Sequence, residues 1–180
     1  MRKKPMNIGI YTLGALIVFF IGYVSFDKLN DPNTTNQFPD RETTFTSKST
    51  NNTLRDSIVE YGIELLGTPY VTAGSGKEGF DCSGFVNFVY HHFNINVPRS
   101  SAAFENFGKE IPIAEVEKGD LLLFLSPTRN AIGHIGIITN AKGPESDFIH
   151  ASSGRQMKVI ITNLSNEGYT RRFVKAIRVL

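Results

Sequence analysis

The second half of the chain carries short runs of mostly β-branched or aromatic residues, and this pattern constrains the fold more than any other. Gly, Asn, Ser or Pro residues separate the runs, as is typical of turns between strands. The runs are Leu121–Leu125, Ile135–Thr139, Phe148–His150, Met157–Thr162 and Phe173–Val179. Because the connections are too short for helical crossovers, we expect these strands to be antiparallel.

Two helical patterns precede the strands. The first is expected to begin at Thr53, as an N-cap, and to end at Gly67, with Pro69 preventing its continuation. The second begins at Cys82, after a glycine-rich loop, and its apolar residues recur at helical spacing until shortly before Pro98. Helices followed by strands predict an α+β domain, with N-terminal helices packed on a short-stranded antiparallel sheet.

An uncharged run of 19 residues, Ile8–Phe26, follows the basic cluster Arg2–Lys4 near the N-terminus. As a helix it would span roughly 28 Å, close to the thickness of a hydrocarbon core. The basic cluster agrees with the positive-inside rule, and no small-x-small cleavage motif follows the run. We expect residues 1–28 to be a membrane anchor, with a cleaved secretory signal and a buried core helix as alternatives. With an anchor or a signal, the rest of the chain is exported.

Residues 29–52 are polar, rich in Asn, Thr and Ser, and lack both helical and strand periodicity. We expect a flexible linker, which leaves residues 53–180 for one domain with a modest core. The chain has 19 Lys and Arg against 17 Asp and Glu, and the basic residues form no stripe that could neutralise phosphates. The charge pattern therefore argues against nucleic-acid binding.

The chain has a single cysteine, Cys82, which excludes an intrachain disulfide and any site with several thiolates. The first turn of a helix presents unpaired N–H groups and the positive end of the helix dipole. We therefore expect the pKa of the Cys82 thiol to fall below the ~8.5 of free cysteine. This placement is typical of a nucleophile, and the alternative is a small buried hydrophobic residue.

A cysteine nucleophile needs a base, and the chain has four histidines. His91 and His92 lie roughly 13–15 Å along the same helix from Cys82, too far to serve it, and we expect them to be surface residues. His134 and His150 fall on adjacent expected strands, where both could lie near Cys82. The alternatives are two strand histidines bonded to backbone groups, and a zinc site formed with Cys82.

Six blocks of the sequence match a known family in their order as well as their residues. The blocks are Gly67–Tyr70, Gly79–Val86, Pro98–Ser100, Gly119–Phe124, His134–Ile137 and Phe148–Ser152. In this order they resemble the NlpC family of exported cell-wall cysteine peptidases, and the resemblance covers Leu54–Leu180. It implies a papain-like α+β fold that hydrolyses amide bonds in peptidoglycan stem peptides or their cross-links, with no cofactor and no metal.

The resemblance also implies roles for individual residues. Cys82 matches the nucleophile, His134 the general base and acid, and His150 the polar residue that orients His134. The positions expected to border the substrate groove are Tyr70, Asp81, Ser83, Arg99 and Ser100. Family members commonly continue the tyrosine block with Trp and two glycines, whereas this chain has Val71–Gly74.

Two other functions fit the same residues. One is an amidase or acyltransferase of the same fold, and the other is a catalytically idle wall-binding module. The expected partners are peptidoglycan stem peptides and, through the N-terminal segment, a membrane. We expect a monomer whose catalytic domain lies in the periplasm or outside the cell.

Overall fold

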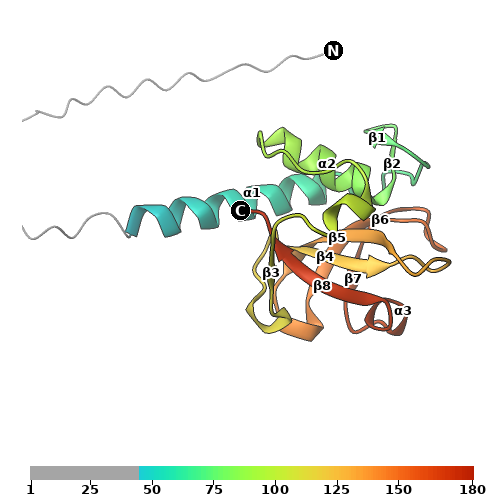
Figure 1. Ribbon diagram of the computed structural model, residues 1–180. Coiled ribbons are helices and arrows are strands. Elements are labelled where there is room, and N and C mark those ends of the chain that lie inside the picture. Colours follow the sequence, from blue (N-terminus) through green and yellow to red (C-terminus); the bar gives the residue numbers. More distant parts are fainter. Residues whose placement is uncertain (1–44) are drawn as a thin grey trace, which may run out of the picture. The chain divides into compact units, whose positions relative to one another are not determined.

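The computed structural model describes residues 45–180 of the chain, with side chains for most of them from Thr50 onward (Figure 1). The anchor expected at residues 1–28, and most of the linker expected at 29–52, lie outside the described residues. Within the described part of the chain, no helix is both long and apolar enough to cross a membrane.

The first helix, α1 (Phe45–Glu64), begins earlier than the sequence predicts, so the expected N-cap at Thr53 is wrong. Several Ser, Thr and Asn residues precede Thr53, and any of them could cap a helix. Extending a helix costs less than nucleating one. Once Ile58 and Val59 fix the helix by burial in the core, it can continue toward its N-terminus through weak helix formers.

The second helix, α2 (Cys82–His92), confirms the expected position of Cys82 at its first residue. Asp81 is the N-cap, and its Oδ1 accepts a hydrogen bond of 2.6 Å from the backbone N–H of Gly84. Phe85, Val86 and Val89 are buried along the inner face of the helix. The chain's only cysteine is therefore held at a well-capped helix start.

The five expected strands are confirmed, and all the neighbouring strands of the main sheet are antiparallel. The strands of this sheet are β3 (Lys109–Ile111), β4 (Leu121–Leu125), β5 (Ile132–Asn140), β6 (Asp147–Ser152), β7 (Lys158–Asn163) and β8 (Phe173–Arg178), in the spatial order β3-β8-β4-β5-β6-β7. The sequence did not predict β3, because this edge strand buries only Ile111 and gives no alternating pattern.

Short elements complete the described part of the chain. They are a two-stranded sheet of β1 (Ser75–Gly76) and β2 (Gly79–Phe80), the short helix α3 (Glu167–Thr170), and the 3₁₀ helices η1 (Ser101–Phe104), η2 (Ile113–Glu115) and η3 (Gly143–Glu145). The small sheet lies directly before Cys82, and α3 lies directly before β8. Both elements lie next to the candidate site described below.

The main sheet separates two apolar clusters. Figure 1 shows α1 and α2 against one side of the sheet, where α2 shares a cluster with Ile135, Ile137 and Ile149. The other side carries a smaller cluster that contains Phe124 and Phe148. Alternation along the strands separates these residues between the two faces. The expected α+β arrangement of helices on an antiparallel sheet is confirmed.

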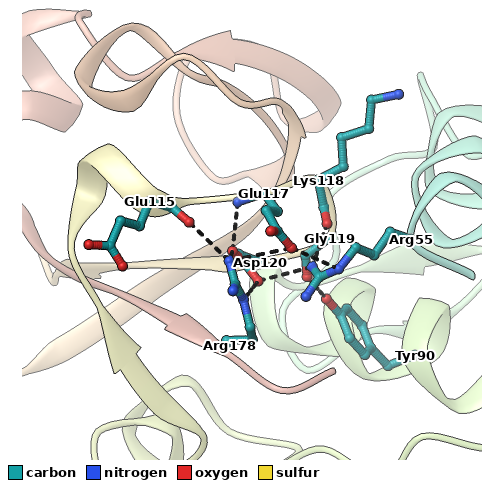
Figure 2. A network of polar contacts seen from close by, with 8 residues as sticks. All are labelled: Arg55, Tyr90, Glu115, Glu117, Lys118, Gly119, Asp120 and Arg178. Atoms are coloured by element: carbon teal, nitrogen blue, oxygen red, sulfur yellow. Dashed lines mark hydrogen bonds and ion pairs between the residues drawn. The ribbon is translucent and has the colours of Figure 1, made fainter. Parts of the chain in front are cut away.

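A network of charged residues joins the first helix to the last strand (Figure 2). Its centre is Asp120, which is completely buried just before β4. Asp120 accepts hydrogen bonds from Arg55 Nη1 at 3.1 Å and from Arg178 Nη2 at 2.7 Å. The residues of the network are Arg55, Tyr90, Glu115, Glu117, Lys118, Gly119, Asp120 and Arg178. Asp120 therefore connects α1 and β8 through a single carboxylate.

We expect Asp120→Asn to lower the free energy of unfolding by about 3 kcal/mol, because it leaves two guanidinium groups without their shared buried partner. The matched control is Asp56→Asn, which removes a carboxylate that pairs with Lys118 at 2.7 Å on the surface. That exposed pair is expected to contribute less than about 1 kcal/mol. Urea unfolding of both variants measures the two changes in the free energy of unfolding. Equal decreases in the two variants would show that burial of the network does not add to its stabilising effect.

Candidate active site

Cys82 lies where α2 meets the beginning of β5. Its Sγ is 3.8 Å from the carbonyl oxygen of Gly133, the residue that precedes His134. Asp81 fixes this end of α2 by capping it. The structure therefore brings the thiol to the residue next to the histidine that the sequence predicts as its base.

The pKa of Cys82 moves in the direction opposite to the expected one. Burial raises the pKa of the thiol most, and the negative charge of Asp81 raises it further. Backbone hydrogen bonds involving Ser83, Ile135 and Cys82 itself lower it only in part. The helix start by itself favours the thiolate, but the burial of the thiol and the charge of the capping residue outweigh it. The thiol is therefore neutral in the free protein near neutral pH.

Cys82 also fits, in part, the alternative of a small buried hydrophobic residue. The residue is 8% exposed and belongs to the larger apolar cluster. It also lines a surface hollow of about 510 Å³, so the thiol borders solvent-accessible space. Cys82 is thus packed like a core residue on one side and open to a ligand on the other.

His134 and His150 form a hydrogen-bonded pair. Nε2 of His134 lies 3.0 Å from Nδ1 of His150, and the two rings are nearly perpendicular, at 88°. Nε2 of His150 lies 3.0 Å from Oγ1 of Thr162 on β7. Both histidines are buried, and side chains are the partners in these two hydrogen bonds. A backbone hydrogen bond involving Ala151 also acts on His150, so the alternative of strand histidines bonded to backbone groups describes His150 in part.

Burial is also the main cause of the low pKa values of His134 and His150. It lowers the pKa of His134 well below 6.5, and the nearby His150 and the positive charge of Arg172 lower it further. Burial lowers the pKa of His150 to about 3, a backbone hydrogen bond involving Ala151 offsets part of this shift, and Arg172 adds to it. Both rings are therefore neutral near neutral pH, which matches the neutral thiol.

The five residues expected to border the substrate groove lie in the same hollow as Cys82. The residues that line it are Tyr70, Thr72, Ala73, Asp81, Cys82, Ser83, Arg99, Ser100, Ser101 and Gly133. Burial, followed by the proximity of Cys82 and Asp81, raises the pKa of the Tyr70 hydroxyl, so it stays protonated and can donate a hydrogen bond. The structure thus brings the expected residues together beside the thiol.

Arg99 and Asp81 are already engaged within the protein. Arg99 Nη2 is 2.9 Å from Asp81 Oδ2, and it also donates to the carbonyl oxygens of Ala73 and Gly74. Ala73 has a positive φ of 60°, a conformation that favours glycine. Its position falls in Val71–Gly74, the segment where this sequence departs from the family pattern that it resembles. Arg99 therefore stabilises a strained loop that forms one wall of the hollow.

A second hollow, of about 540 Å³, shares Gly133 with the first and is lined by His134. Sequence reasoning missed this hollow and the residues Tyr169 and Arg172 in its wall. The Tyr169 ring packs against both histidines, with centroids 5.9 Å from His134 and 5.2 Å from His150. No motif marks either residue, because they follow an irregular turn whose path depends on tertiary contacts.

The other two histidines of the chain lie outside this pair. His91 and His92 are exposed, as expected. Among the described residues, no group of three His, Cys, Asp or Glu side chains could hold a metal ion. The ring nitrogens of His134 and His150 are directed at each other and at Thr162, which is the arrangement of a proton relay.

The chain is similar to several named bacterial enzymes. A probable endopeptidase of Haemophilus influenzae is 32% identical over 117 residues, which cover 64% of this chain and 69% of that protein. The murein DD-endopeptidase MepS/murein LD-carboxypeptidase of Escherichia coli is 30% identical over 128 residues, covering 71% and 64%. A gamma-D-glutamyl-L-lysine dipeptidyl-peptidase of Bacillus cereus is 30% identical over 126 residues, covering 69% of this chain but 36% of that protein.

Solved structures and a family model agree with these relatives. An NlpC/P60 family protein from Bacillus cereus superposes with a TM-score of 0.63 at 29% identity, covering 70% of this chain and 40% of that one. The NlpC/p60 domain of the peptidoglycan hydrolase SagA gives 0.56 at 27% identity, covering 69% and 97%. These matches confirm the papain-like α+β fold. Because the NlpC/P60 family model matches residues 67–178, the chain belongs to the NlpC/P60 family.

Proposed function

We propose that this protein is a peptidoglycan endopeptidase, a cysteine peptidase that hydrolyses amide bonds in stem peptides or their cross-links. Family membership and the names of the relatives support this function. The observation that carries it is the position of the Cys82 thiol beside Gly133, directly before a histidine whose Nε2 bonds to a second histidine. This arrangement has the three parts of a nucleophile, a base and an orienting group.

The hydrogen bonds define which nitrogen of His134 reacts. To act as a base, neutral His134 needs a free lone pair, and its Nε2 is engaged with His150. Nδ1 is therefore the accepting nitrogen, and Nε2–H donates to Nδ1 of His150. His150 must then carry its own proton on Nε2, from which it donates to Oγ1 of Thr162. The Thr162 hydroxyl can accept this bond, so the contact is compatible with the tautomers that the reaction requires of His150 and His134.

The first half of the reaction forms an acyl-enzyme. Nδ1 of His134 takes the proton of the Cys82 thiol as the sulfur attacks the scissile carbonyl carbon. The backbone N–H of Cys82 lies in the first turn of α2, where it can donate to the oxyanion, and Tyr70 lines the same hollow. When the C–N bond breaks, the imidazolium of His134 gives its proton to the departing amine.

The second half releases the acyl group. His134, neutral again, takes a proton from a water molecule as the water oxygen attacks the thioester carbonyl. The C–S bond then breaks, the sulfur of Cys82 regains the proton from His134, and a carboxylic acid leaves. Burial disfavours the charged forms of both the thiol and the histidine pair, so the proposed reaction starts from the neutral groups.

Two alternatives make different products. An amidase of the same fold would free stem peptides from sugar, and an acyltransferase would pass the acyl group to an amine. A catalytically idle wall-binding module would make no product. The hydrogen-bonded histidine pair favours a catalytic protein, because a binding module has no need of a buried proton relay.

The test is mass spectrometry of muropeptides after incubation of purified peptidoglycan with the full chain, with Cys82→Ala as the matched control. An endopeptidase shortens or separates stem peptides while leaving them attached to sugar. Stem peptides released from sugar would identify an amidase, and new amide linkages an acyltransferase. Bound but unchanged peptidoglycan would identify a wall-binding module.

We also propose that residues 1–28 anchor a monomeric, exported enzyme in the membrane. The uncharged run Ile8–Phe26 and the basic cluster before it support the anchor, and a murein substrate requires export. The full chain is expected to fractionate with membranes and to be released only by detergent, as a monomer in sedimentation. A soluble mature protein that begins near residue 26 would instead identify a cleaved signal.

A further inference from the structure

The two hollows described above meet at one residue. Gly133 lines both, while Cys82 lines only the first and His134 only the second. In the proposed reaction the acyl group bonds to Cys82, and the leaving amine takes its proton from His134. The hollow that contains His134 is therefore on the amine side of the scissile bond.

The wall of this second hollow carries positive charge. Arg171 and Arg172 both line it, and none of the described residues that line it is acidic. Within the described part of the chain, the side chain of Arg171 is paired only with Glu167, at 3.4 Å, in a highly exposed contact of the kind that contributes little. The hollow thus presents two guanidinium groups and no carboxylate of its own.

Arg172 is fixed but not neutralised. Its Nε donates to the carbonyl oxygen of Gly168 at 2.8 Å and its Nη1 to that of Leu125 at 3.0 Å, and the guanidinium lies 5.1 Å from the centre of the Tyr169 ring. Within residues 53–180, its Nη2 makes no hydrogen bond and the group has no ion pair. Arg172 is therefore a preorganised donor whose charge is available to a ligand.

The other hollow provides a contrast. There the guanidinium of Arg99 pairs with the carboxylate of Asp81 and also donates to Ser83 and to backbone carbonyls. The charge of Arg99 in the first hollow is thus offset by a carboxylate, whereas Arg172 in the second hollow has no acidic partner among the described residues. This difference favours anion binding in the hollow that contains His134.

We propose that Arg171 and Arg172 bind a free carboxylate carried by the leaving amino acid, so that the enzyme prefers amide bonds whose amine side bears such a group. This inference rests on the proposed function and names a feature of its substrate. Planar guanidinium groups bind carboxylates through paired, charge-assisted hydrogen bonds. The bound carboxylate lies beside His134, where it orients the amine that receives the proton.

The same contact couples substrate binding to the base. The positive charge of Arg172 contributes to the low pKa of His134. A carboxylate bound to Arg172 offsets that charge and makes His134 a better acceptor for the thiol proton. We therefore expect the preference to appear in kcat as well as in KM.

The test compares two synthetic substrates that differ only at the leaving residue, one with a free carboxylate and one with a carboxamide. The full-length protein is expected to hydrolyse the carboxylate with a kcat/KM about 10 to 100 times higher. Arg172→Gln should bring this ratio close to one, and Arg171→Gln should lower it. Arg171→Gln is the second variant because its side chain makes no backbone contact that folding could require.

The control is Lys142→Gln, which removes one positive charge from an exposed side chain that lines neither hollow and should keep the ratio unchanged. The ratio does not depend on the fraction of folded enzyme, so partial unfolding cannot imitate the effect. Equal hydrolysis of both substrates by the unmodified protein, or a ratio that survives both arginine substitutions, overturns the inference. If the unmodified protein hydrolyses neither substrate, the proposed function is wrong, and the inference that rests on it is wrong as well.

Discussion

Replacing Cys82 with serine is expected to reduce peptidoglycan hydrolysis on the order of 10³-fold or more while leaving the protein folded. A serine hydroxyl is a far weaker acid than a thiol. His134, whose pKa is lowered by burial, is a poor base for it. The hydroxyl can still donate to the carbonyl oxygen of Gly133, and the side chain is nearly the same size. The thermal midpoint should therefore change by only a few degrees, which corresponds to about 1 kcal/mol.

Release of soluble muropeptides and circular dichroism melting check the two halves of this prediction. Cys82→Ala is the companion variant, because it removes the nucleophile without adding a polar atom to the cluster. If both variants unfold, Cys82 acts mainly as a packing residue. If Cys82→Ser hydrolyses at the unmodified rate, the proposed nucleophile is wrong.

The second large effect separates His134 from His150. An amide cannot exchange a proton near neutral pH, so His134→Asn should lose activity on the order of 10³-fold or more. His150 is proposed to accept a hydrogen bond from Nε2–H of His134 through its Nδ1. The carbonyl oxygen of an asparagine can occupy nearly the same position as Nδ1, whereas a glutamine oxygen extends further.

We therefore expect His150→Asn to keep a measurable fraction of the activity, His150→Gln to keep less, and His150→Ala to keep least. Initial rates on one muropeptide substrate, normalised to the folded fraction, give this order. An active His134→Asn together with inactive amide variants of His150 would mean that the two roles are exchanged. Equal loss in all the His150 variants would mean that orientation of His134 requires an intact imidazole.

The parts of the fold that the sequence predicts best are those that local patterns determine. The bounds of β4 agree residue for residue with the apolar run Leu121–Leu125. Cys82 is the first residue of α2, as a polar loop followed by helical spacing predicts. The pairing of His134 and His150 follows from register, because short antiparallel connections place β5 and β6 side by side.

Features that depend on distant residues escape sequence reasoning. Nothing local indicates that Asp120 is buried between arginines of the first helix and the last strand. The raised pKa of Cys82 reflects packing around the thiol, which a helix-dipole argument does not include. Arg172 is part of the second hollow because the turn before β8 passes the histidine pair, a path that no periodicity in the sequence predicts.

The last strand of the described chain, β8, determines when the main sheet can be completed. β8 lies between β3 and β4, so the sheet has a gap at an interior position until β8 is added. Arg178, in the same strand, completes the buried carboxylate network begun by Arg55. Until β8 has been made and added, the chain has no continuous sheet, and Asp120 lacks its second arginine. The sheet can therefore be completed only after residue 178 is free to pair, so the fold of residues 53–180 is acquired late in synthesis rather than strand by strand.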